Sequence, residues 1–173
     1  MCAGIGSKEI GKMVGLDIPL WGFKGHSLDV WHKDKSKMFK HANLLLPEQV
    51  AIVPMGIEKP YTRFTGFADV DLNNKSVIKS RKESLIKIAK EYMGDEYDDA
   101  NADHWVGLRP VTPDDTPFIC NSSKYKNLWL NTGHGSRGMS SSMGSSKMLS
   151  LLITGQEVPK SFDQKAFDIR RFY

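Results

Sequence analysis

Hydrophobic and polar residues alternate along several short segments of the chain, which is the pattern of half-buried β-strands. Between residues 21 and 32, Leu28 and Val30 fall on one face of an extended segment, and Asp29 falls on the other. The other strand candidates are residues 50–55, 61–68, 104–109 and 128–130. Asn73 and Asn74 signal a turn after the third candidate.

Two segments have the period of a helix instead. In residues 80–93, Ser80 and Glu83 have the spacing of a capping box, and Gly94 is a stop signal. The apolar positions of this segment are Leu85, Ile86, Ala89, Tyr92 and Met93. The second helix is predicted from Met139 to about Thr154, where Gly155 ends it.

The first fifteen residues have the pattern of a strand end, a turn and a short helix. We predict that Ser7 caps a helix that runs through Met13 and stops at Gly15. A parallel strand needs neighbours on both sides, and none precedes residue 2 in this sequence. We therefore expect the chain to be the back part of a larger protein. The order of strands and helices predicts an α+β or mixed α/β fold and not a helical bundle.

Composition places the chain among globular proteins. It has 173 residues, of which 40% are hydrophobic and 25% charged, so we expect one domain or slightly more. The net charge of +4 is modest. Residues 75–90 are rich in Lys and Arg, and residues 91–103 are acidic. A solvated helix followed by an acidic loop is favoured there over a nucleic-acid surface, because Tyr92 is the only aromatic side chain within five residues of the basic stretch.

Several classes of site and location are disfavoured. Cys2 and Cys120 form neither a disulfide framework nor a CxxC motif, which favours a reducing compartment. The five histidines show no paired ligand spacing, so we expect no metal site. Residues 1–30 hold no apolar leader, and no apolar run approaches the ~20 residues of a membrane span. We expect a cytoplasmic location, with peripheral attachment to the inner face of the membrane as the open alternative.

The turn between the strand at 128–130 and the last helix is the strongest candidate site. Gly133, Gly135 and Gly138 allow a ligand to approach the backbone, and the helix start offers unpaired N–H groups and a positive dipole end. An anion site and an ordinary tight turn are equally good interpretations of this pattern. The glycines from Gly4 to Gly11 resemble a dinucleotide fingerprint, but their spacing is wrong and no strand precedes them, so we reject them as a phosphate loop.

Arg109 lies at the end of a predicted strand, directly before Pro110. A guanidinium fixed there could bind a carboxylate with two parallel hydrogen bonds. On spacing alone, a structural salt bridge is the favoured interpretation. The sequence shows no nucleophile with its base, so a cofactor would carry the chemistry of any enzyme built from it.

Two stretches resemble a known family. Residues 105–117 (WVGLRPVTPDDTP) and 125–135 (YKNLWLNTGHG) are similar to the C-terminal part of FAD-dependent D-amino-acid dehydrogenases, in the D-amino-acid oxidase and glycine oxidase group. The resemblance extends back through residues 24–28 and 2–4, and it fades by Phe172. It implies that residues 1–15 end an FAD-domain unit, that 16–114 form the second half of a mainly antiparallel substrate sheet, and that 115–173 return to the FAD domain as a strand–turn–helix.

The resemblance also implies roles for particular residues. Arg109 matches the arginine that binds the substrate carboxylate, and His26 stands in the substrate site where the family usually has Tyr. Residues matched to the cofactor are Gly4, Gly135, Ser136, Arg137, Gly138, Met139 and Ser140. The implied chemistry is hydride transfer from the α-carbon of a D-amino acid to FAD, giving a 2-oxo acid and ammonia, with electrons passed to a respiratory acceptor.

The family's N-terminal phosphate-binding motif and the first half of its substrate sheet are missing from this sequence. We therefore expect the chain alone to bind FAD poorly and to be inactive without an N-terminal half-chain. The alternative is a non-catalytic remnant or interaction module without flavin, which would associate with itself through an exposed sheet edge.

Overall fold

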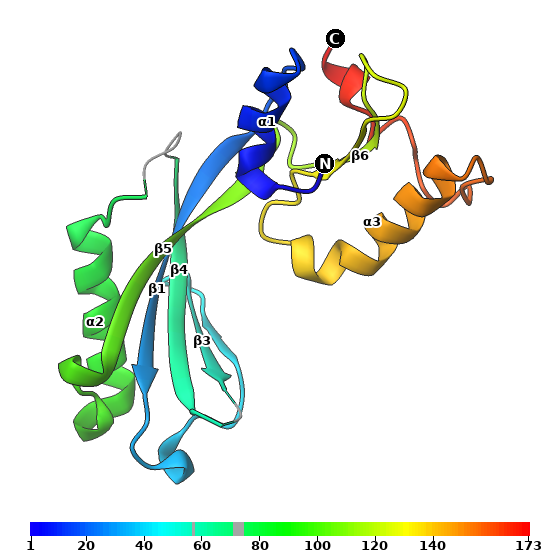
Figure 1. Cartoon of the computed structure of the whole chain (residues 1–173). Helices are drawn as coiled ribbons and strands as arrows, with labels where there is room; N and C mark the ends of the chain where they lie inside the picture. The colour runs from blue at the N-terminus through cyan, green and yellow to red at the C-terminus, as the bar shows by residue number, and fades with distance from the viewer. Residues whose placement is uncertain (57, 71–74) are drawn as a thin grey trace. The chain divides into compact units, whose positions relative to one another are not determined.

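The computed structural model describes residues 1–56, 58–70 and 75–173, and the predicted turn at Asn73 and Asn74 lies outside them. The chain forms two compact units (Figure 1). The first combines Met1–Phe23 with Leu108–Tyr173, and the second combines Lys24–Asp69 with the described residues from 75 to Gly107. The fold is mixed α/β with antiparallel strand pairs, as the sequence predicts.

The larger sheet has five strands in the order β2-β3-β4-β1-β5. Its strands are β1 (Trp21–Trp31), β2 (Asn43–Leu45), β3 (Val50–Met55), β4 (Tyr61–Val70) and β5 (Ala102–Val111). β3 pairs antiparallel with both β2 and β4, and Ile52 lies opposite Phe64. The sequence predicts every strand but β2, whose three residues are too few to show a period.

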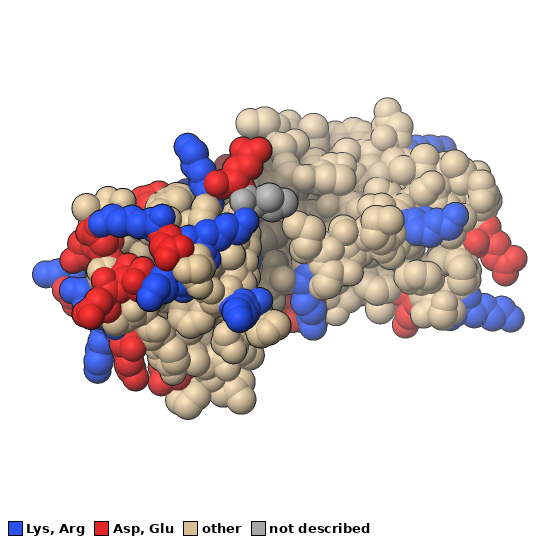
Figure 2. Space-filling model, turned by 90° about the horizontal axis from the view of Figure 1, so that it is seen from below, with Lys and Arg blue, Asp and Glu red and all other residues tan. Residues whose placement is uncertain are grey.

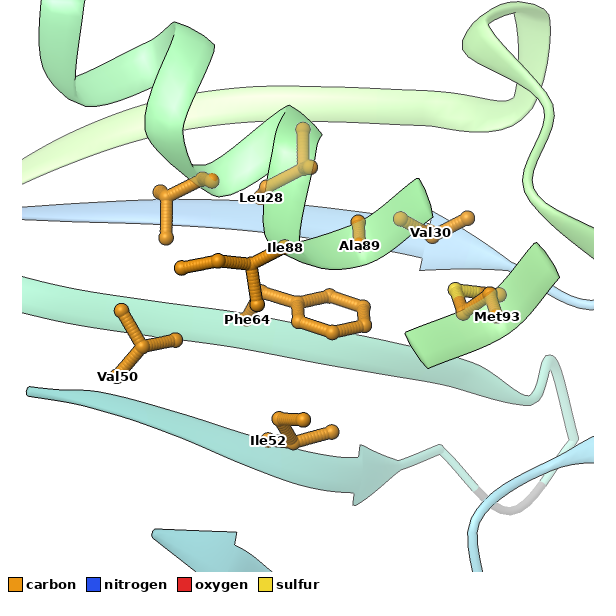
Figure 3. Close-up of a cluster of buried hydrophobic side chains, with 9 residues drawn as sticks. Leu28, Val30, Val50, Ile52, Phe64, Ile88, Ala89 and Met93 are labelled. Carbon is orange, nitrogen blue, oxygen red and sulfur yellow. The ribbon is translucent and has the colours of Figure 1, made fainter. Parts of the chain in front are cut away.

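Helix α2 (Lys79–Met93) packs on this sheet, which confirms the most distinct helix of the sequence. Its apolar residues meet side chains of β1, β3 and β4 in one cluster (Figure 3). The buried members are Leu28, Val30, Val50, Ile52, Phe64, Leu85, Ile88, Ala89 and Met93.

The predicted cap of α2 is wrong. The helix begins at Lys79 after Ile78, whose extended backbone is the cap position, and no side chain caps it. Ser80 is already helical, so its hydroxyl cannot occupy the cap position. Gly94 follows the helix with a φ of 56°, as a stop residue should.

The first unit contains a two-stranded antiparallel sheet of β6 (Phe118–Asn121) and β7 (Trp129–Thr132). Alternate β6 residues face two different clusters. Phe118 and Cys120 pack with Leu16, Ile18, Leu20, Leu130 and Ile169, and Ile119 packs with Met148, Leu151 and Val158. The last cluster anchors helix α3 (Gly138–Ile153), which confirms the second predicted helix within a residue at each end.

The N-terminal segment packs beside β7. The Met1 amine donates to the Trp129 carbonyl, and the Asn131 amide donates to the Met1 carbonyl, which is the pattern of a parallel pair. Helix α1 (Ser7–Met13) follows the 3₁₀ turn η1 (Gly4–Gly6), with the predicted extent. Ser7 is its first helical residue and not its cap, because its hydroxyl instead donates to the Thr132 hydroxyl in the interior.

The remaining elements are short 3₁₀ turns: η2 (Lys35–Lys37), η3 (Gly94–Glu96), η4 (Asp99–Asn101) and η5 (Ile169–Phe172). Among the described residues, no helix is both long enough and apolar enough to cross a membrane.

Candidate functional site at the start of α3

The turn from β7 into α3 requires its glycines. Gly133 and Gly135 have φ values of 83° and 57°, in the left-handed region that favours glycine. A Cβ atom at Gly133 would lie 2.6 Å from the Thr112 methyl carbon, and one at Gly135 would lie 2.9 Å from Asp115 Oδ1. The turn is therefore held tightly against the segment that follows β5.

This turn is bonded to the end of the strand that carries Arg109. The Gly135 amide donates to the Pro110 carbonyl over 2.8 Å, and Val111 forms a β-bridge with His134. Arg109 is partly buried. The structure thus brings the backbone of the predicted substrate arginine and that of the predicted cofactor turn together.

The start of α3 has no side-chain cap. Arg137 occupies the cap position, and the hydroxyls of Ser140 and Ser141 turn back to donate to its carbonyl. The first amides of the helix are therefore not capped by a side chain, and they carry the positive end of the helix dipole. Met139 is 90% exposed at this end of the helix.

Asp115 is a partner that the sequence did not reveal. Its carboxylate forms an ion pair with the Arg137 guanidinium, which also donates to the Asp115 carbonyl over 2.9 Å. The pair joins the loop after β5 to the start of α3. Only the tertiary contact identifies it, because the two residues are 22 positions apart.

A cavity of about 390 Å³ opens beside this helix start. Its lining residues are Asp115, Thr116, Pro117, His134, Arg137, Ser140, Ser141 and Phe167. Burial lowers the pKa of His134, so its ring is neutral at pH 7. Arg109 is not among the lining residues, and a cavity shared by Arg109 and the helix start stays a prediction.

Gly4 lies close to β7 and to the end of β5, the two strands that contact the glycine turn. Its φ is 56°, and its carbonyl accepts a hydrogen bond from the Thr132 hydroxyl over 3.1 Å. A Cβ at Gly4 would lie 4.0 Å from the Pro110 side chain. Thr132, which no sequence signal marked, therefore connects the N-terminal turn with the strand that enters the glycine turn.

His26 belongs to the second unit and is fully buried there. Its Nδ1 lies 3.4 Å from His104 Nε2, and its Nε2 lies 3.7 Å from an oxygen of Asp69. Burial lowers the pKa of His26, Asp69 opposes this shift, and Lys24 and Arg81 reinforce it. Direct contact with a substrate would require the covering side chains to move, and the substrate role of His26 stays a prediction.

Comparison with known proteins identifies the family. A model of the DAO family, described as FAD dependent oxidoreductase, matches residues 1–152. The chain belongs to this family. D-amino acid dehydrogenases from Azorhizobium caulinodans and Chromohalobacter salexigens are 33% and 30% identical to it over 159 and 172 residues. These matches cover 92% and 99% of this chain.

Solved structures share the DAO-family fold. Glycine oxidase from Geobacillus kaustophilus matches 96% of this chain with a TM-score of 0.68 and 19% identity. L-proline dehydrogenase from P. horikoshii matches 99% of it with a TM-score of 0.75 and 13% identity. At these identities the likeness concerns the fold.

The chain spans about two fifths of the length of its relatives. It covers 37% and 40% of the two dehydrogenases, and 43% and 46% of the two solved structures. The matched part of this DAO-family chain includes the β5 end, the glycine turn and most of α3. Among the described residues, no three His, Cys, Asp or Glu side chains lie together in a way that could hold a metal ion.

Proposed function

We propose that this chain supplies the substrate-binding part and the flavin-ring part of an enzyme that oxidises D-amino acids to 2-oxo acids and ammonia. The hydrogen bond from the Gly135 amide to the Pro110 carbonyl carries this proposal. It supports a site in which a carboxylate-binding arginine and a helix start lie close together. The names of the curated relatives favour D-amino acids as the substrate class.

The start of α3 fits FAD in its chemistry. Its first amides have no side-chain cap, and it is the positive end of the helix dipole. Such an end stabilises negative charge on a ring placed against it. The residues proposed to hold the flavin end are Gly4, Gly135, Ser136, Arg137, Gly138, Met139 and Ser140. When bound, FAD would supply the chemistry of hydride acceptance from the substrate α-carbon.

Arg109 is proposed to bind the substrate carboxylate with two parallel hydrogen bonds. Because the guanidinium stands at a strand end whose backbone is bonded to the glycine turn, the bound carboxylate would be held in a fixed position. Fixing the carboxylate orients the α-hydrogen of the substrate, which is how a binding residue can raise the rate of a reaction step. His26 is proposed as a second residue of the substrate site.

The rest of the FAD site would come from a segment that corresponds to the part of the relatives that this chain does not cover. In dinucleotide-binding folds, a glycine-rich strand–loop–helix holds the pyrophosphate. An N-terminal half-chain is therefore proposed as the partner, and a respiratory carrier as the electron acceptor. An interaction module without flavin is the alternative if the completed protein shows no amino-acid-dependent electron transfer.

Replacing Arg109 tests the proposal. The completed enzyme is made by joining to Met1 the part of the A. caulinodans dehydrogenase that precedes the match. Arg109→Lys keeps the charge but loses the planar fork. Because a charged hydrogen bond is worth about 1.5 to 3 kcal/mol, we expect the KM for D-amino acids to rise about tenfold. Flavin reduction should also slow, as measured by stopped-flow absorbance.

Arg170→Lys is the matched control, because this arginine is 64% exposed and is bonded to Asp168. It should change neither KM nor the rate of flavin reduction. The flavin spectrum should be the same in both variants. An unchanged KM and reduction rate in Arg109→Lys would show that Arg109 is a structural residue.

A further inference from the structure

Two histidines of the second unit lie side by side on neighbouring strands. His26 on β1 is 0% exposed, and its Nδ1 lies 3.4 Å from Nε2 of His104 on β5. The outer ring nitrogens, His26 Nε2 and His104 Nδ1, are buried, and neither has a hydrogen-bond partner among the described residues. Buried polar atoms without a partner are rare in native proteins, so these two nitrogens need a chemical explanation.

A neutral pair of imidazoles always leaves one outer nitrogen as a bare lone pair. Two neutral rings carry two protons on four nitrogens. One proton occupies the hydrogen bond between the rings, and the other occupies one outer nitrogen. A third proton, taken from solvent, fills the remaining outer nitrogen. A fourth would place two positive rings in direct contact, so the pair binds one proton much more readily than two.

Asp69, near the end of β4, stands between this pair and helix α2. One of its oxygens lies 3.7 Å from His26 Nε2. The same carboxylate accepts three hydrogen bonds of 2.7 to 3.2 Å from the Arg81 guanidinium. Arg81 lies in the first turn of α2, where its amide donates to the Ile78 carbonyl over 3.0 Å. The carboxylate therefore holds the start of the helix, although the outer nitrogen of His26 is close to it.

Phe67 adds backbone strain to the same place. Its φ of 65° lies in the left-handed region, which is unfavourable for a bulky side chain. Its ring centre lies 6.2 Å from that of His26 and 4.5 Å from the Arg81 guanidinium carbon. Strain of this kind persists only where surrounding contacts maintain it. A movement of Arg81 away from Asp69 would remove one of these contacts.

The charged groups that face the two histidines come from every element packed on them. They are Lys24 of β1, Asp69 of β4, Arg81 and Lys82 of α2, and Asp103 of β5. Burial is the main cause that lowers the pKa of both histidines; the cations add to the shift and the carboxylates oppose it. Figure 2 shows other charges of both signs crowding the surface of this unit, where water screens them. The pair is thus neutral near pH 7 and binds its proton below the ordinary value of about 6.5.

We propose that His26, His104, Asp69 and Arg81 form a pH-sensitive switch, called here the histidine switch, that controls the start of α2. In mild acid a proton from solvent binds the bare outer nitrogen, and His26 Nε2 then carries an N–H bond in every arrangement of the charged pair. Asp69 turns from Arg81 to accept this N–H, and its hydrogen bonds to Arg81 break. The first turn of α2 opens more often, while the buried cluster that includes Leu85 keeps the rest of the helix packed.

Amide hydrogen exchange, measured residue by residue by NMR, tests the switch in the 173-residue chain. The amides of Arg81 and Lys82 both donate to the Ile78 carbonyl, so their exchange reports opening of the first turn. One coupled proton changes an opening equilibrium by at most about tenfold per pH unit. Relative to amides of the second half of α2, these two should exchange about tenfold faster at about pH 5 than at about pH 7. A ratio that does not change with pH would overturn the proposal.

His104→Gln should remove the response to acid. A glutamine amide can donate to His26 Nδ1 from about the position of the lost Nε2, so His26 keeps its proton on Nε2 and no bare nitrogen remains. Asp69→Asn should instead make the first turn exchange fast at both pH values, because Arg81 has lost its carboxylate. His41→Gln, at an exposed histidine of the same unit, is the matched control and should respond like the unchanged chain. An acid response that survives His104→Gln would contradict the switch.

The ring signals of the histidines give a second measurement that needs no variant. In an NMR titration of the unchanged chain, His26 and His104 should shift together, with one midpoint below about pH 6.5 and one proton bound between them. Two separate midpoints, or neutral rings at a pH where the first turn already opens, would count against the proposal. Neither readout uses flavin or substrate, so the outcome is independent of the proposed function.

Discussion

Asp114 connects the loop after β5 to the end of the chain. Its two carboxylate oxygens accept hydrogen bonds from Nε and Nη2 of Arg171 at 2.8 and 3.0 Å. The Arg171 guanidinium carbon lies 4.6 Å from the ring centres of both Phe118 and Phe172. Hydrogen bonding to Arg171 lowers the pKa of Asp114 to about 2. The stabilisation from this pair is therefore present above the ordinary carboxyl pKa and is lost as the pH falls toward 2.

We predict that Asp114→Asn lowers the melting temperature at neutral pH, and that the difference from the unchanged protein shrinks between about pH 4 and pH 2. Protonation of Asp114 makes it resemble asparagine, so the two melting curves should converge in acid. Thermal unfolding followed by circular dichroism measures this. Asp95→Asn, at an exposed residue of η3, should show no such convergence. A constant difference at every pH would contradict the role of the ion pair.

Helix α2 contributes its stability through one buried face. Leu85 is fully buried in the cluster shared with β1, β3 and β4. Leu85→Ala should lower the free energy of unfolding by about 2 to 5 kcal/mol, because it removes buried methyl groups and leaves a cavity. Urea denaturation measures the change. Lys87→Ala, two positions along on the exposed side, should stay within about 0.5 kcal/mol of the unchanged protein.

Sequence patterns predicted these elements where the chain has a clear period. The α2 period was correct, but its buried face includes Ile88, whereas Tyr92 is 44% exposed. β6 was missed because Phe118, Ile119 and Cys120 form an unbroken apolar run that packs on both faces, so no alternation marks it. The predicted cap at Ser7 was wrong because its hydroxyl donates to the Thr132 hydroxyl, and the one at Ser80 was wrong because the helix begins a residue earlier. The bond that Ser7 makes depends on tertiary contacts.

At the scale of the whole molecule, part of the candidate site could be predicted from the sequence. The glycines of the turn are visible in the sequence, and the left-handed backbone of Gly133 and Gly135 explains why those two are needed, whereas Gly138 is already helical. The pairing of Asp115 with Arg137 and of His26 with His104 joins residues 22 and 78 positions apart. No local pattern encodes such pairs. The family of the chain was identified from the match over residues 1–152, because the periodicity of single helices and strands does not show how distant segments come together.

The last prediction concerns flavin binding by a chain of these 173 residues. In dinucleotide-binding folds the pyrophosphate and adenosine lie against a glycine-rich strand–loop–helix. Here residues Gly4–Gly6 form a 3₁₀ turn that leads into a helix of seven residues, so this glycine segment does not build that element. The contacts proposed at the start of α3 would reach the flavin end only. We therefore expect the purified chain to be colourless near about 450 nm, where bound flavin absorbs, even after incubation with FAD and gel filtration. The fusion with the N-terminal segment of the A. caulinodans dehydrogenase should be yellow under the same conditions. A yellow chain with one flavin per molecule would mean that α3 and its turn hold the cofactor without a phosphate-binding loop.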